Sequence, residues 1–323
     1  MSASDPHLAN ALAAQFVRIG YVAANVRDLE RSRAFYEAVT PLRARTRTRA
    51  PLQPFTLLGE AQGRFDGWLM DDGSGGDPTC LHLIQWQEPA PRGQANPTFF
   101  HAGWGKMAIS HRGAQEVLDR LAAHGVRPSN PTIHRDYVSI TDPDGIVISF
   151  LPNPQRPPSL FHCVSGPSDP ARTVRFYQAL FGLEYWMKSQ PPAPLPTSQG
   201  PGAEIVQWDS HILRAWGDHR FNIDVSKILF PAQTGTPNPD PLAIGIARIG
   251  MEVRDIEPAF DLIGRALATG EHGAARLAGP IEDWDYGPDA PRRRAFALKD
   301  PDGMHIDIYQ PERHFVASAP TAA

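Results

Sequence analysis

The stretch that decides the fold is IGYVAANVRDLERSRAFYEAV, at residues 19–39. An apolar run is followed by Asp28, and apolar residues then recur at helical spacing. This pattern predicts a strand and then a helix that begins after Asp28 as its N-cap. The stretch LFHCVSGPSDPARTVRFYQALFGL, at residues 160–183, repeats the pattern with Asp169 at the cap and Pro170 in the first turn. The chain therefore contains an internal repeat, which constrains its architecture.

Two further pairs of segments match in the same order along the chain. The helix-like GAQEVLDRLAAHGV at residues 113–126 corresponds to IEPAFDLIGRALATG at residues 256–270. The segment TDPDGIVISFLPNP at residues 141–154 corresponds to KDPDGMHIDIYQPE at residues 299–312. Asp, Pro and Gly in DPDG are typical of a tight turn, so each of these segments predicts a hairpin that leads into a strand.

Length and composition agree with two copies of one domain. The chain has 323 residues, and an average domain has roughly 150. A content of 41% hydrophobic and 20% charged residues indicates a globular protein. The proline-rich segment at residues 152–159 has no apolar period and predicts the boundary. We expect one domain at residues 15–152 and a second at residues 159–312.

Charge and cysteine content exclude several classes of partner. A net charge of -4 gives no basic surface for nucleic acid or anionic lipid. No apolar run approaches the roughly 20 residues that span a bilayer, and no basic segment precedes the first apolar stretch. Cys80 and Cys163 have neither metal-site nor redox spacing, so we expect reduced thiols. The prediction is a cytoplasmic protein with no membrane or nucleic-acid partner.

These segments resemble the vicinal-oxygen-chelate superfamily of glyoxalases, bleomycin resistance proteins and extradiol dioxygenases. The resemblance rests on DLERSRAFYEAV after an apolar strand, on the second strand–helix unit, and on DPDG before an alternating strand. It implies an α+β fold of two tandem domains. Each domain is expected to pair two βαβββ units into an open, cup-shaped mixed sheet with helices outside. The chemistry stays open, because one fold hosts many functions.

The resemblance also implies four inward strand positions in each domain, where relatives hold a metal. In the first domain these positions carry Tyr21, His82, Lys106 and Ser149. Metal ligands must be unprotonated nitrogen, sulfur or oxygen donors, and an ammonium group at Lys106 would repel a cation. We therefore expect a degenerate site in this domain.

In the second domain the corresponding residues are His162, Asp224, Arg248 and Asp307. The cofactor is then either a divalent metal held by His162, Asp224 and Asp307, or none. Because a guanidinium cannot ligate a metal and opposes its binding, we favour a metal-independent site. In that site Arg248 replaces the metal, and His162, Arg248 and Asp307 are catalytic. An internal ion pair of Arg248 with Asp307 or Asp224 is the alternative.

Aromatic residues add two candidate substrate contacts. We expect Trp208 and Tyr286 to line the pocket beside Asp224, although ordinary core packing would also explain them. The partner is a small-molecule substrate, and a homodimer is left open.

Three functions follow from the resemblance. The first is lyase or isomerase chemistry on a substrate with a carboxylate, enolate or phenolic oxygen. The second is metal-free binding of the drug-resistance type, without turnover, and the third is extradiol ring cleavage. Titratable groups such as His162 favour an enzyme, because proton transfer needs a group poised near neutrality.

Overall fold

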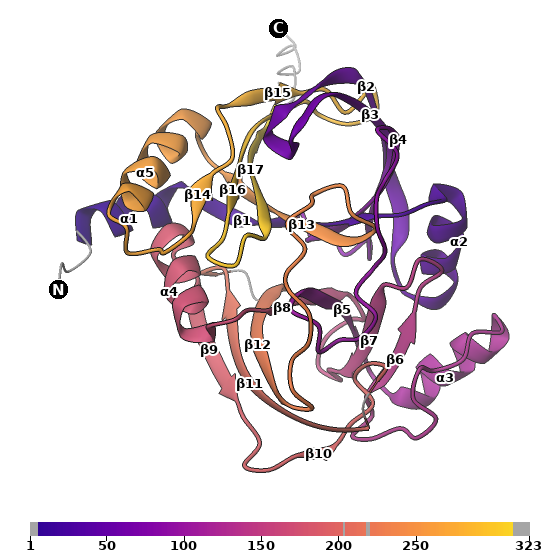
Figure 1. Ribbon diagram of the computed structural model, residues 1–323. Helices are drawn as coiled ribbons and strands as arrows, with labels where there is room; N and C mark the ends of the chain where they lie inside the picture. Colours follow the sequence, from indigo (N-terminus) through magenta and orange to yellow (C-terminus); the bar gives the residue numbers. More distant parts are fainter. Residues whose placement is uncertain (1–5, 203, 218–219, 313–323) are drawn as a thin grey trace, which may run out of the picture.

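The structure is a computed structural model that describes residues 6–202, 204–217 and 220–312. Within these residues, five α-helices and two mixed sheets form an α+β fold, which confirms the predicted class (Figure 1). The helices are α1 (Pro6–Gln15), α2 (Leu29–Val39), α3 (Ala114–Ala123), α4 (Pro170–Phe181) and α5 (Ile256–Ala268), with a 3₁₀ turn at Thr56–Leu58.

The first sheet has nine strands, which come from the beginning and the end of the chain. At its centre β1 runs parallel to β4 and antiparallel to β13. In order across the sheet the strands are β14 (Arg276–Leu277), β16 (Arg293–Lys299), β17 (His305–Pro311), β13 (Gly245–Val253), β1 (Phe16–Asn25), β4 (Cys80–Glu88), β3 (Glu60–Asp71) and β2 (Arg43–Phe55), while β15 (Glu282–Trp284) pairs with β16.

The second sheet has eight strands, which come from the middle of the chain. At its centre β8 runs parallel to β12 and antiparallel to β5. In order the strands are β10 (Leu195–Pro196), β11 (Ile205–Arg214), β12 (Asn222–Phe230), β8 (Leu160–Gly166), β5 (Gly103–His111), β7 (Val147–Pro152) and β6 (Val138–Thr141), while β9 (Glu184–Ser189) pairs with β11.

Each sheet combines units that are not consecutive in the chain. Ala23 on β1 pairs with Arg248 on β13, and Ala108 on β5 pairs with His162 on β8. The first unit therefore joins the fourth, and the second joins the third, so the expectation that consecutive units would form each cup is wrong. The ranges 15–152 and 159–312 remain a proposed division of the sequence and do not coincide with the two sheets.

The predicted caps and turns are present. Asp28 and Asp169 each accept a hydrogen bond from a backbone N–H in the first turn of their helices, α2 and α4. In the two DPDG turns, Asp142 and Asp300 each accept from two backbone N–H groups of their own turn. These four carboxylates therefore have structural partners, as the cap and turn patterns predict.

A helix that precedes the predicted first domain ties the two halves together. Helix α1 packs against both α4 and α5. Gly182 ends α4 with φ of 60°, and a Cβ atom there would lie 2.6 Å from the Cβ of Ala13 on α1. Glycine is thus required at this position both by the left-handed backbone and by the close approach of α1.

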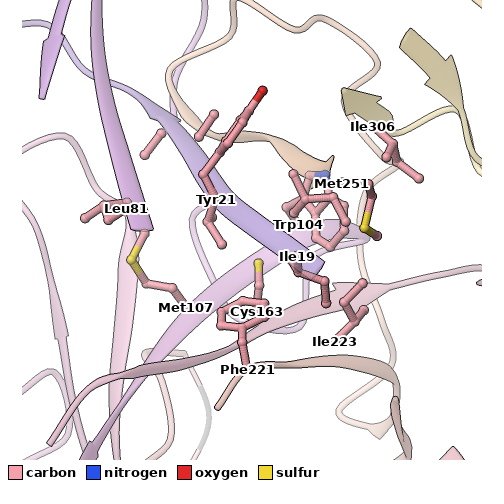
Figure 2. Packing of buried hydrophobic residues seen from close by; sticks show 14 of the residues in the cluster. Ile19, Tyr21, Leu81, Trp104, Met107, Cys163, Phe221, Ile223, Met251 and Ile306 are labelled. Atoms are coloured by element: carbon pink, nitrogen blue, oxygen red, sulfur yellow. The ribbon is translucent and has the colours of Figure 1, made fainter. Parts of the chain in front are cut away.

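Figure 2 shows side chains of the two sheets meeting in a common core. Ile19 and Met251 come from the nine-stranded sheet, and Met107 and Cys163 come from the eight-stranded sheet. The hydroxyl end of Tyr21 points away from Met107 and Cys163 in the same view. Because side chains alternate along a strand, each sheet has a second face that is turned away from this shared core.

Candidate functional site

The eight-stranded sheet encloses a cavity of about 120 Å³ on the face turned away from the shared core. Its lining includes Lys106 from β5, His162 from β8, Asp224 from β12 and Trp208 from β11. Strand alternation explains this placement, because Met107, the residue after Lys106, packs in the core between the sheets. His162 and Asp224 likewise alternate with core residues. Three ionisable groups from separate strands are thus brought to one cavity.

Lys106 is buried at this cavity, with 3% of its surface exposed. Its Nζ donates to Gln199 Oε1 at 2.9 Å and to the Gln199 carbonyl oxygen at 3.2 Å. The same Nζ lies 5.0 Å from the centre of the Phe99 ring. Burial lowers the pKa of Lys106 to about 7, against the opposing effect of the Asp224 carboxylate. Near neutral pH this amine therefore exists in both protonation states.

Asp224 and His162 are the other ionisable groups of the cavity. Burial raises the pKa of Asp224, against the hydrogen bond from the Ser210 hydroxyl and the charge of Lys106. Burial, together with the charge of Lys106, lowers the pKa of His162 to about 3, so its imidazole is neutral at pH 7. Among the described residues, His162 Nε2 has no hydrogen-bond partner. A buried nitrogen without a partner is costly, and it is free to bind a ligand.

The cavity does not fit the divalent metal that the superfamily resemblance implies. It supplies His162 and Asp224 as donors, but a metal site normally has at least three, and the amine of Lys106 lies beside them. The hydroxyl of Ser149 already donates to the Gln199 carbonyl. In the part of the chain that is described, no group of three or more His, Cys, Asp or Glu residues could hold a metal.

The other half of the predicted site lies in the nine-stranded sheet. Arg248 Nε donates to Asp307 Oδ2 at 2.9 Å, and Arg248 Nη1 donates to the Pro241 carbonyl at 2.8 Å. The hydroxyl of Tyr21 donates to the same Asp307 Oδ2 at 2.8 Å. The side chains of Arg248 and Asp307 are 2% and 0% exposed. The geometry therefore favours the internal ion pair over a substrate contact for Arg248.

Packed side chains fill the interior of this second cup. The guanidinium of Arg293 lies 4.9, 4.7 and 4.6 Å from the ring centres of Tyr21, Tyr286 and Tyr309. Tyr286 is 1% exposed, so it belongs to this cluster and not to the cavity that Trp208 lines. His82 Nε2 lies 3.0 Å from the Thr48 hydroxyl, within hydrogen-bond distance. Within the described residues, Arg293 Nε and Nη1, His82 Nδ1 and Asp307 Oδ1 have no hydrogen-bond partner, so this cup is tightly packed but only partly hydrogen-bonded.

The structure thus divides the predicted site between two sheets. His162, Asp224 and Trp208 lie together at the cavity. The packed cup of the other sheet contains Arg248, Asp307 and Tyr286. The structure therefore does not bring together the predicted catalytic residues, His162, Arg248 and Asp307. It also separates the predicted metal ligands, because Asp307 lies apart from His162 and Asp224.

Sequence reasoning missed the part that Lys106 and Gln199 play in the cavity. It placed Lys106 in a degenerate site, because it combined consecutive units of the repeat. One signal was available: Lys106 is one of only four lysines in the chain, and it lies within the apolar stretch that became β5. Gln199 gave no signal, because it lies in an irregular loop after β10.

Comparison with known proteins agrees with this architecture. The family model for the Glyoxalase/Bleomycin resistance protein/Dioxygenase superfamily matches residues 18–150. This match shows that residues 18–150 are similar to that superfamily. No curated protein matches the sequence.

Solved structures of the superfamily share the fold at low sequence identity. Glyoxalase I from Zea mays is 13% identical with a TM-score of 0.65, covering 91% of this chain and 92% of its own. A mutant of the same Zea mays enzyme has a TM-score of 0.69 at 13% identity, with 94% and 96% covered. A putative dioxygenase from Bacillus subtilis has a TM-score of 0.59 at 16% identity, with 94% and 88% covered. At these identities the likeness concerns the fold alone. No helix within the described residues is long and apolar enough to span a membrane.

Proposed function

We propose that this protein is an enzyme of the lyase or isomerase type that moves a proton on an oxygen-bearing small molecule without a metal. The observation that carries the proposal is the amine of Lys106, buried at a cavity with a pKa of about 7. A general base works best when its pKa lies near the working pH. Lys106 therefore takes the proton-transfer role that the sequence suggested for His162 and Asp307.

The residues around Lys106 suit such a step. The neutral amine can accept a proton from the carbon next to a carbonyl group, and the resulting ammonium stabilises the negative oxygen of the enolate. Gln199 holds the amine in place through its two oxygens. Apolar side chains such as Val206 and Ile228 line the cavity and keep its polarity low, which strengthens the electrostatic interaction.

Exchange of a carbon-bound proton with solvent tests the proposal. Butanal has acidic hydrogens next to its carbonyl, and their replacement by deuterium in D₂O can be followed by NMR. We expect the wild-type protein to accelerate the exchange and Lys106→Met to lose about 100-fold or more of this rate. Lys227→Met is the matched control, because Lys227 Nζ bonds the Ser168 carbonyl near the surface. Exchange at an unchanged rate in Lys106→Met would refute the role of Lys106.

Metal-free binding without turnover is the second candidate, favoured by the aromatic lining that Phe99 and Trp208 provide. A binding protein would take up butanal in calorimetry and catalyse no exchange. Extradiol ring cleavage has less support, because iron in such sites needs two histidines and a carboxylate, and the cavity brings His162 alone with Asp224. A homodimer stays a proposal that sedimentation velocity can test.

A further inference from the structure

We propose that Lys106 forms a covalent imine with an aldehyde or ketone bound in the cavity of the eight-stranded sheet. The inference deepens the proposed function and rests on it, because it requires that this cavity receives a small oxygen-bearing molecule. It names the chemical class of that molecule as a carbonyl compound, and it assigns the amine of Lys106 as the nucleophile.

The hydrogen bonds of Lys106 match a neutral amine. A neutral amine has two N–H groups and one lone pair, whereas an ammonium has three N–H groups and no lone pair. The two acceptors of Lys106 Nζ are the two oxygens of Gln199. No ion pair between described residues involves Lys106. The two acceptors match the two N–H groups of a neutral amine, which would keep its lone pair for an electrophile.

The low pKa of Lys106 also favours its action as a nucleophile. At pH 7 an ordinary lysine, with a pKa of about 10.4, is neutral in well under 0.1% of molecules. A pKa of about 7 makes roughly half of the Lys106 side chains neutral at that pH. A lysine freed of its proton by an apolar pocket is the usual nucleophile in imine chemistry.

The cavity also holds groups that can move the protons of the reaction. The amine lone pair attacks the carbonyl carbon, and the carbon–oxygen π pair moves to oxygen, which takes a proton from the carboxyl of Asp224. His162 Nε2, which has no partner among the described residues, can accept one proton from the carbinolamine nitrogen and return it to the hydroxyl group, which leaves as water while the C=N bond forms. The iminium nitrogen then gives its remaining proton back to the Asp224 carboxylate. The net change is amine plus carbonyl compound to imine plus water.

The shape and lining of the cavity limit the carbonyl compound. A volume of about 120 Å³ is below the range of drug-sized pockets, which starts at roughly 300 Å³. The walls include Phe99, Val206, Trp208 and Ile228, and Asp224 is the acidic residue among the lining. A small, uncharged aldehyde or ketone with an apolar side group suits this space better than a dianionic one.

Borohydride trapping of the full-length protein tests the inference. The protein is incubated with benzaldehyde or butanal at pH 7.5 and treated with sodium borohydride, which delivers hydride to the imine carbon and leaves a stable secondary amine. The chain contains only four lysines, Lys106, Lys188, Lys227 and Lys299, so peptide mapping can assign every adduct. We expect at least about tenfold more adduct on Lys106 than on the more exposed Lys188, because the low pKa of Lys106 leaves roughly half of its amines neutral near pH 7.

Two variants sharpen the result. Lys106→Arg keeps a cation and cannot form a stable imine, so its adduct yield should fall to the level of the surface lysines. Lys188→Arg is the matched control and should keep the Lys106 adduct. If a Lys106 variant fails to fold, the peptide map of the wild-type protein alone still decides, because the four lysines are compared within one chain.

The two probes separate this inference from the proposed function. Benzaldehyde has no hydrogen on the carbon next to its carbonyl, so it reports imine formation alone, whereas butanal also reports proton exchange. An adduct on Lys106 without exchange of butanal protons would support the imine and refute proton-transfer catalysis. Exchange that depends on Lys106 without any adduct there would overturn the imine and leave the proposed function intact. Adducts spread over the surface lysines, with neither binding nor exchange, would overturn both.

Discussion

Replacement of Arg248 distinguishes a structural ion pair from a substrate contact. In Arg248→Met the carboxylate of Asp307 stays buried with the Tyr21 hydroxyl as its remaining donor, while the Pro241 carbonyl keeps the hydrogen bond from the Asn25 side-chain amide. Breaking one partner of a buried ion pair costs about 3 to 5 kcal/mol, because the other charge is left uncompensated. The Tyr21 bond places the expected loss at the lower end, near 3 kcal/mol.

Urea unfolding followed by circular dichroism measures this loss directly. The double variant Arg248→Met/Asp307→Asn is the matched control, because asparagine removes the charge and keeps an acceptor for Tyr21. We expect the double variant to regain a large part of the stability. Borohydride trapping at Lys106 should stay near the wild-type yield in both variants, since the cavity lies in the other sheet. An Arg248→Met protein that unfolds like the wild type but loses trapping or exchange would show that Arg248 serves the ligand.

Two predictions concern pH. The folded pKa of Lys106 is about 7, below the value of about 10.4 in an unfolded chain, so between these pH values the unfolded state holds more protons. The unfolding free energy of the wild type should therefore rise with pH across that window, by at most about 1.4 kcal/mol per unit, and Lys106→Met should lack this rise in parallel urea titrations. A slope equal to that of the wild type would contradict the low pKa. The folded pKa of His162 is about 3, below the unfolded value of about 6.5, so stability should fall as pH drops from 6.5 towards 3. His162→Gln should lose less stability than the wild type between pH 6.5 and 4 in thermal melts; an equal loss would show that His162 takes up its proton in the folded state.

Local features of the fold could be predicted because their causes are local. An N-cap such as Asp28 and a DPDG turn are set by a few adjacent residues, which satisfy backbone groups within one turn. The pairing of the four units could not be predicted in the same way. It depends on which central strands meet, such as β5 with β8, and strand patterns alone do not specify a partner. Because the prediction paired consecutive units, it grouped Lys106 with Tyr21, whereas the structure places Lys106 beside His162. It likewise grouped Arg248 with His162, whereas the structure places Arg248 beside Tyr21.

The two sheets carry a cation at equivalent places and give it different surroundings. Lys106 follows Gly103 by three residues as Arg248 follows Gly245, and each cation lies on a strand whose parallel neighbour supplies the next inward residue. In the nine-stranded sheet that residue is Asp307, and the carboxylate pairs with the guanidinium.

In the eight-stranded sheet the equivalent residue is Ser149, whose hydroxyl cannot neutralise a charge and donates instead to the Gln199 carbonyl. Lys106 shares that carbonyl and forms no ion pair with a carboxylate of the described residues. Burial therefore outweighs the opposing charge of Asp224 and lowers the pKa of Lys106 to about 7. The two cups therefore differ in one carboxylate. In the nine-stranded sheet Asp307 pairs with Arg248, whereas in the eight-stranded sheet Lys106 is a titratable amine at a cavity. Ser149→Asp should give Lys106 a carboxylate partner like that of Arg248, which would raise the pKa of Lys106 and abolish the borohydride adduct. An adduct that survives this substitution would show that the absence of a carboxylate at position 149 is not what keeps Lys106 reactive.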